Sequence, residues 1–272
     1  MTREEYHQIP ALNFSMAKWL LRSPAHFKAA QDEEREETEA MRIGTLVHAM
    51  VLEGKDLRDI YAIKPEGMSF STKEGKAWRD AQTLPILTQD AADGIPRIAE
   101  AIARNPDAAA ALHGCPVRER GITFQMRGMA CKALLDCSGT DGNSWAIGDL
   151  KTAADASPRE FARQAYKMHL DMQAAWYSDG LAAVEGLETP PWFFWIVAEK
   201  KSPFFNVLYQ PDARMMESGR AKMAKALSRY IRCMETGEWP LPLTGIQTLE
   251  LPHYAVIEER EEEEFHREGR AA

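Results

Sequence analysis

The sequence predicts an α/β protein in which helices flank a mixed sheet and a site lies at one edge of that sheet. Two apolar runs, residues 131–136 and 145–152, are joined by a turn-rich segment, 138–144, and therefore predict a β-hairpin. A strand over 121–126 precedes this hairpin, and a long helix over 157–185 follows it. Three antiparallel strands between helical segments are typical of a sheet whose faces are covered by helices.

The N-terminal elements follow from helical spacing and capping residues. Residues 13–30 predict a short helix with Ser15 as its N-cap and an end before Pro24. After a charged stretch over residues 31–39, a second helix is predicted over 41–53, because its apolar side chains recur at helical spacing: Ile43, Leu46, Val47, Met50 and Val51.

The remaining elements are assigned in the same way. Residues 64–80 contain glycine and lysine and predict a loop. The long helix begins at Ser157, with Pro158 in its first turn. The other predicted elements are two helical pieces over 89–112, strands over 192–198 and 204–209, and a basic amphipathic helix over 212–234.

Length and composition favour a single soluble domain. The chain has 272 residues and is 45% hydrophobic and 27% charged, an ordinary composition for a globular protein. Because it shows no internal repeat and no long linker, it predicts one domain over residues 1–256. Residues 258–270 hold seven Glu and three Arg, so we expect residues 257–272 to form an acidic, disordered tail.

Hydropathy and charge limit the partners. No window approaches the roughly 18 consecutive apolar residues of a membrane span, and the N-terminus lacks a signal-peptide apolar region. We therefore expect a cytoplasmic protein with no membrane partner. The formal net charge of −8 argues against a broad surface for nucleic acid. Any DNA groove is expected to be local and lined by specific basic residues.

The cysteines do not form a recognisable framework. The four of them are irregularly spaced and include no Cys-x-x-Cys pair: Cys115, Cys131, Cys137 and Cys233. This spacing argues against a disulfide scaffold and against a structural zinc site. We expect four buried free thiols.

Asp149 and Lys151 form the most informative pair in the chain. Because side chains two apart on a strand point to the same face, their carboxylate and ammonium lie side by side. Such a carboxylate can hold a divalent cation while the lysine positions or activates a water. The predicted hairpin brings Asp136 close to Asp149. The plain alternative is a solvated strand end with a surface ion pair.

Four further side chains are candidates. His48 lies on the apolar helix over 41–53, and Glu119 lies just before the first strand. Gln173 and Tyr177, at positions i and i+4, share one face of the long helix. Taken singly, they also suit a core histidine, a surface charge and the polar edge of a packed helix. The basic set on the last helix suits a solvated face: Arg220, Lys222, Lys225, Arg229 and Arg232.

Taken together, these residues and their order resemble the PD-(D/E)XK nucleases, and within them the exonuclease VIII (RecE) family of recombination exonucleases. The resemblance spans residues 12–255 and is carried by residues 44–53, 72–76, 131–133, 149–152, 172–180, 237–240 and 251–252. The chain departs from the family at Leu134, where relatives often have an arginine two residues before the first metal-binding aspartate. This departure puts a DNA or phosphate contact at that position in doubt.

The resemblance implies a PD-(D/E)XK core and a site for two Mg²⁺ ions, with Mn²⁺ as a substitute. Lys151 would orient the attacking water or neutralise charge on the phosphate. Gln173 and Tyr177 would hold Lys151 or that water in position. The implied metal ligands are Asp136, Asp149, the carbonyl of Leu150, Glu119 and His48.

The same resemblance implies an exonuclease that degrades one strand of linear duplex DNA 5′→3′ and leaves 3′ single-stranded tails for recombination by strand annealing. It also implies a ring-shaped homo-oligomer, with a tetramer favoured, and a single-strand annealing recombinase as a partner. The candidates for a 5′-phosphate pocket are Ser15, Lys18 and Arg42.

Three alternatives remain open from the sequence. The first is another nuclease with the same core, either an endonuclease or an enzyme with an iron–sulfur cluster, although the cysteine spacing disfavours the cluster. The second is a DNA-end-binding module with a vestigial core, against which the intact Asp136, Asp149 and Lys151 argue. The third is an α/β protein whose acidic pair is only structural.

Overall fold

The computed structural model describes residues 1, 3–33 and 38–251. Residues Met1–Pro240 form one compact unit, and Leu241–Ala272 form a second, of which residues 241–251 are described. The predicted acidic tail over 257–272 lies outside the described residues, and the single domain over 1–256 stays a prediction. Among the described helices, none has the length and apolar character needed to cross a membrane.

The first unit is built on a mixed sheet, as the sequence predicts. Its strand order is β1-β5-β6-β7-β8, with β4 paired to β5. The β4–β5, β5–β6 and β7–β8 pairs are antiparallel, whereas β1–β5 and β6–β7 are parallel. The strands are β1 (Leu12–Asn13), β4 (Val117–Met126), β5 (Met129–Thr140), β6 (Trp145–Ala153), β7 (Trp192–Glu199) and β8 (Asn206–Tyr209).

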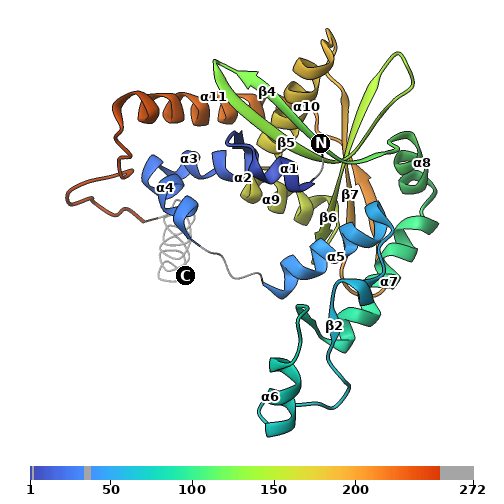
Figure 1. Cartoon of the computed structure of the whole chain (residues 1–272). Coiled ribbons are helices and arrows are strands. Elements are labelled where there is room, and N and C mark those ends of the chain that lie inside the picture. Colours follow the sequence, from blue (N-terminus) through green and yellow to red (C-terminus); the bar gives the residue numbers. More distant parts are fainter. Residues whose placement is uncertain (2, 34–37, 252–272) are drawn as a thin grey trace, which may run out of the picture. The chain divides into compact units, whose positions relative to one another are not determined.

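Two hydrophobic cores lie on opposite faces of this sheet. On β7, Phe193 and Trp195 belong to one core, whereas Phe194 and Ile196 belong to the other. Since neighbouring residues on a strand face opposite ways, the two cores are separated by the sheet. Helices cover both faces, so the predicted α/β architecture is confirmed (Figure 1).

The helices divide between the two cores (Figure 1). On the first face lie α2 (Phe14–Ala17), α3 (Trp19–Arg22), α4 (Pro24–Asp32), α9 (Pro158–Met168), α10 (Leu170–Glu185) and α11 (Ala213–Thr236). On the second face lie α5 (Glu39–Glu53), α7 (Gln89–Arg104) and α8 (Pro106–Gly114). A short N-terminal helix, α1 (Arg3–Gln8), precedes β1.

The parallel β6–β7 pair requires a crossover connection, which α9 and α10 provide. The single helix predicted over 157–185 is wrong in one respect, because it breaks at His169, whose φ of 58° is left-handed. Pro158 occupies the first turn of α9 as predicted, but the Ser157 side chain makes no capping hydrogen bond.

The helix predicted over 13–30 is three short helices. Asn13, rather than Ser15, caps the first, since its Oδ1 accepts a hydrogen bond from the Met16 amide at 2.9 Å. A helix does end before Pro24, as predicted, since α3 ends at Arg22; Pro24 then begins α4, where Ser23 Oγ caps the amide of His26. Ser15 is exposed on α2.

The loop predicted over 64–80 contains a helix, α6 (Lys73–Asp80). Thr72 caps it, with its hydroxyl accepting from the Gly75 amide at 3.0 Å. A β-carbon at Gly75 would collide with the carbonyl of Ser69, so only glycine lets this loop close against the helix. The surrounding lobe, between α5 and α7, also contains the 3-10 turn η1 (Leu57–Asp59) and a parallel pair, β2 (Ala62–Ile63) and β3 (Ile86–Leu87).

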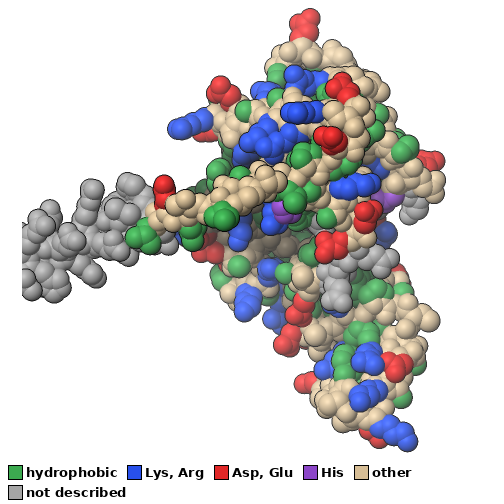
Figure 2. Space-filling view, turned by 90° about the vertical axis from the view of Figure 1, so that its left-hand side faces the viewer, with side chains coloured by type: hydrophobic (Ala, Val, Ile, Leu, Met, Phe, Trp, Pro, Cys, Tyr) green, Lys and Arg blue, Asp and Glu red, His purple; other side chains and the backbone are tan. Residues whose placement is uncertain are grey.

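Three of the five basic residues predicted to form a solvated face of α11 contact neighbouring elements, whereas Lys225 and Arg232 are exposed. Arg220 forms a bidentate ion pair with Asp179 on α10, at 2.8 to 3.1 Å. Arg229 donates to the carbonyls of Leu20 and Leu21. On the face shown in Figure 2, basic and acidic side chains are interspersed.

Candidate metal centre

Three acidic residues lie at one level of three neighbouring strands. The β4–β5 pairs Arg118–Cys137 and Arg120–Leu135 flank Glu119 and place it opposite Asp136. The β5–β6 ladder ends at the pair Cys137–Gly148, and the same register places Asp136 opposite Asp149. Because residues opposite one another on neighbouring strands are close, the register brings the three acids to one level. Glu119 and Asp136 place ligand atoms within 4.8 Å of each other, whereas the Asp149 carboxylate is not part of that group and contacts Lys151 and Gln173.

The strand β5 is irregular at this level. Leu135 belongs to one core and Cys137 to the other, although residues two apart on a regular strand share a face. Opposite Asp136, Glu119 has a left-handed φ of 47°. A local departure from regular strand geometry therefore occurs where the acids meet, and such departures commonly re-aim side chains at functional sites.

His48 reaches this group from α5. Its Nε2 lies 2.6 Å from the carbonyl oxygen of Leu150, and its Nδ1 lies 3.4 Å from Asp136 Oδ2. The Leu150 amide donates to the same Asp136 oxygen at 2.8 Å. Ligand atoms of His48, Glu119 and Asp136 all lie within 4.8 Å of one another, and such a group could hold a metal ion.

Asp149 and Lys151 lie side by side, as their spacing on β6 predicts. Asp149 is only 2% exposed and is paired with the ammonium of Lys151. Gln173 on α10 donates from Nε2 to Asp149 Oδ1 at 3.0 Å and contacts the hydroxyl of Tyr177 at 3.3 Å. The resemblance implied that Gln173 holds Lys151 or a water, but the Gln173 side chain donates its hydrogen bond to the Asp149 carboxylate.

Burial and neighbouring charges set the electrostatics of this pair. Burial raises the pKa of Asp149 to about 6; Lys151 opposes this rise, and Asp136 adds to it. Burial also raises the pKa of Tyr177 well above its ordinary value, and the neighbouring Asp149 carboxylate raises it further. Tyr177 therefore remains a protonated hydroxyl at neutral pH.

The raised pKa of Asp149 predicts a pH dependence of stability in the metal-free protein. Since the folded-state pKa of about 6 exceeds the ordinary 3.8, the folded state binds this proton more tightly than the unfolded state. Protonated Asp149 therefore stabilises the folded state fully below about pH 4. As the pH rises through about 6, this stabilisation is lost, and the free energy of unfolding falls by on the order of 3 kcal/mol.

Urea unfolding in EDTA between pH 4 and 7 measures this loss. As the pH rises from 4 to 7, the free energy of unfolding of the wild type should fall relative to that of Asp149→Asn. A difference that stays constant with pH would contradict the assignment of a buried, proton-binding Asp149.

The donor groups fit a divalent cation. Hard oxygen donors suit Mg²⁺ or Mn²⁺, and an imidazole is tolerated beside them. Gln173 Oε1 is also buried and accepts no hydrogen bond from the described residues, which suits a site that receives a further ligand. The side-chain and backbone donors at this level are Asp136, Asp149, Glu119, His48 and the Leu150 carbonyl.

The three predicted phosphate-binding residues do not share one cavity. Lys18 lines a cavity of about 480 Å³ that also contains Arg22, Lys167 and His169. Arg42 lines a different cavity and donates to the carbonyl of Ile86 at 3.3 Å. The sequence analysis did not indicate Arg22, which lies four residues after Lys18, nor Lys167 and His169, which come from the junction between α9 and α10.

The thiols do not surround a common centre. All four cysteines are free and buried. Cys115 and Cys137 belong to the second core, whereas Cys131 lies in the first, across the sheet. This separation argues against the iron–sulfur alternative.

A mixed sheet with helices on both faces and acids from neighbouring strands beside a strand lysine defines a protein of the PD-(D/E)XK class. The chain belongs to the family described as PDDEXK-like domain of unknown function (DUF3799), whose profile matches residues 13–250. Membership of this family supports the assignment of the protein as a nuclease.

One solved structure supports the fold. A crystal structure of a presumed exonuclease from Eubacterium rectale is similar with a TM-score of 0.63 and 16% identity, over 93% of this chain and 95% of that one. The structure of SSO0001 covers 80% of this chain and 84% of its own at 11% identity, but its TM-score of 0.30 carries no argument. No curated protein sequence matches the chain.

Proposed function

We propose that this protein is a Mg²⁺-dependent exodeoxyribonuclease of the RecE type. It digests linear double-stranded DNA, with 5′→3′ polarity, and produces 3′ single-stranded tails for recombination by strand annealing. The observation that carries the proposal is the gathering of Glu119, Asp136 and Asp149 at one level of the sheet, with Lys151 paired to Asp149.

Each residue of the metal centre has its own role in this proposal. Asp136 and Asp149 would hold the cations, which when bound supply an activated water and neutralise charge on the phosphate. The ammonium of Lys151, next to Asp149, places a compact positive charge where the scissile phosphate approaches. Gln173 keeps the Asp149 carboxylate in one orientation through its hydrogen bond.

The cavity beside Lys18 supports recognition of a DNA end. Its lining includes Lys18, Arg22 and Lys167 but, among the residues that the structure describes, no carboxylate. His169, which also lines the cavity, is the N-cap residue of α10 and precedes Gln173 by four residues. A terminal phosphate bound here would lie near the metal centre; of the three residues predicted for a phosphate pocket, Lys18 alone lines this cavity, and Ser15 and Arg42 do not.

Assembly and partners are proposed from the resemblance alone. A ring-shaped homo-oligomer, with a tetramer favoured, would keep the enzyme on its DNA. A single-strand annealing recombinase would receive the 3′ tails.

Digestion of end-labelled DNA tests the proposal. Linear duplex, labelled separately at each 5′ or 3′ end, should lose its 5′ label first in Mg²⁺ or Mn²⁺ and remain intact in EDTA, while closed circular DNA should survive. Cleavage of the closed circle would favour the endonuclease alternative. Binding of ends without digestion in either metal would favour a DNA-end-binding module.

A further inference from the structure

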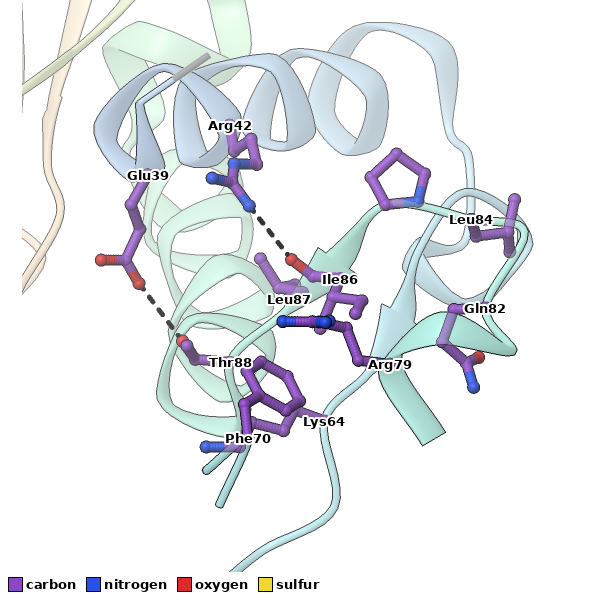
Figure 3. Close-up of a pocket in the computed structure, with 11 residues that line it drawn as sticks. Glu39, Arg42, Lys64, Phe70, Arg79, Gln82, Leu84, Ile86, Leu87 and Thr88 are labelled. Carbon is purple, nitrogen blue, oxygen red and sulfur yellow. Dashed lines mark hydrogen bonds between the residues drawn. The ribbon is translucent and has the colours of Figure 1, made fainter. Parts of the chain in front are cut away.

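A cavity outside the metal centre lies between the start of α5 and the lobe that contains α6 (Figure 3). It has a volume of about 540 Å³. Arg42 comes from α5, Lys64 from the end of β2, and Arg79 from α6, and the three cations line one space with Phe70. The motif around Thr72 and Gly75, which the metal centre does not use, shapes this lobe.

A second cavity, of about 470 Å³, adjoins the first. The two share Glu39 and Thr88, and the second adds Lys200 and Lys201 from the turn after β7. We call the five cations of the two cavities the basic track: Arg42, Lys64, Arg79, Lys200 and Lys201.

The basic track carries an excess of positive charge. Lys64, Lys200 and Lys201 form no ion pair with any residue that the structure describes. Arg79 pairs with Asp80, but both side chains are largely exposed, and such pairs are weak enough to be exchanged for another anion. Against these five cations the lining has two carboxylates, Asp90 and Glu39, and Glu39 accepts a hydrogen bond from the Thr88 hydroxyl.

The track begins beside the metal centre. A β-carbon at Gly44 would lie 3.5 Å from Thr152 Oγ1, so α5 passes close to the end of β6 two residues from Arg42. The Lys200 amide donates to the carbonyl of Ala153 at 3.2 Å, which places the β7–β8 turn at the same strand end. These contacts are made by Thr152 and Ala153, the two residues that follow Lys151 of the metal centre on β6.

We infer that the basic track binds the backbone phosphates of single-stranded DNA that extends from the metal centre. The inference rests on the proposed nuclease function and adds a substrate-binding surface to it. Lysine and arginine side chains that follow one strand bind its phosphates regardless of sequence. Cavities of this size admit single nucleotides, whereas a duplex is too wide to enter them.

The test is binding of a fluorescent 20-nucleotide oligothymidylate to the full chain in EDTA, where no digestion competes. The variant Lys64→Gln/Lys200→Gln/Lys201→Gln should bind at least about tenfold more weakly at 0.1 M salt, and its salt dependence should fall by roughly 2 in log–log slope. The matched control, Lys28→Gln/Lys73→Gln/Lys76→Gln, removes the same charge from exposed lysines outside both cavities and should bind like the wild type.

Three results would overturn the inference. The first is wild-type affinity in the track variant, and the second is an equal loss in the control, which would indicate net charge alone. The third is competition by inorganic phosphate or thymidine monophosphate as strong, per phosphate, as by the oligonucleotide, since this would indicate a site for free phosphate esters. Thermal unfolding of both variants checks that each is folded.

The experiments distinguish a failure of the proposed nuclease function from a failure of the basic-track inference. A wild-type protein that binds the oligonucleotide through the track but digests no DNA in Mg²⁺ or Mn²⁺ would overturn the nuclease proposal. A wild-type protein that digests linear duplex while the track variant binds like wild type would overturn the track alone.

Discussion

Asp149→Asn is expected to reduce metal-dependent digestion of linear duplex DNA by about 10³-fold or more, because metal ions contribute several kcal/mol of transition-state stabilisation. The substitution preserves the size of the side chain and lets Gln173 remain in contact, so the loss reflects the missing negative charge at the metal centre. The measurement is the initial rate of digestion with saturating Mg²⁺, together with calorimetric titration of Mn²⁺.

The same substitution is expected to stabilise the metal-free fold at neutral pH. Asp149 is buried, and its ionisation there is unfavourable. A variant that is more stable and inactive indicates a residue retained for function rather than for the fold. Asp32→Asn, on the exposed end of α4, serves as the control and should retain full activity. Full activity of Asp149→Asn would remove the metal-centre assignment.

Gly219→Ala is expected to lower the free energy of unfolding by about 3 kcal/mol. A β-carbon at Gly219 on α11 would collide with the backbone carbonyl of Asp171 on α10 and lie 3.1 Å from the β-carbon of Ala175. Backbone atoms cannot rotate away as a flexible side chain can, so the two helices must separate. Urea unfolding measures the loss.

Gly94→Ala provides a matched control for this prediction. Gly94 also lies inside a helix, α7, but a β-carbon there would meet nothing within 4 Å. Removing backbone freedom from the unfolded state should then stabilise the protein by about 0.5 to 1 kcal/mol. If both alanine variants changed stability by the same amount and sign, the close contact between α10 and α11 would not be the cause.

Sequence patterns predicted the elements that depend on local spacing. The apolar residues of α5 recur every three to four positions, and those of β5 and β6 form runs interrupted by a turn, so each element could be assigned without its partner. The pairing of Asp149 with Lys151 follows from the two-residue period of a strand. The prediction of a loop over residues 64–80 was wrong. Thr72 caps a helix there, and Gly75 allows a close contact with Ser69, so this glycine belongs to the helix and does not mark a loop.

The order of the elements, the acids on the hairpin and the lysine beside Asp149 were determined by the sequence itself, because they depend on periods of two and 3.6 residues along one segment. Tertiary structure alone decided the rest. The irregularity at Asp136, the contact of Gln173 with Asp149 and the convergence of the basic track depend on strand register and on which helices meet across the sheet. These contacts join residues far apart in the chain, and no local pattern encodes their distance.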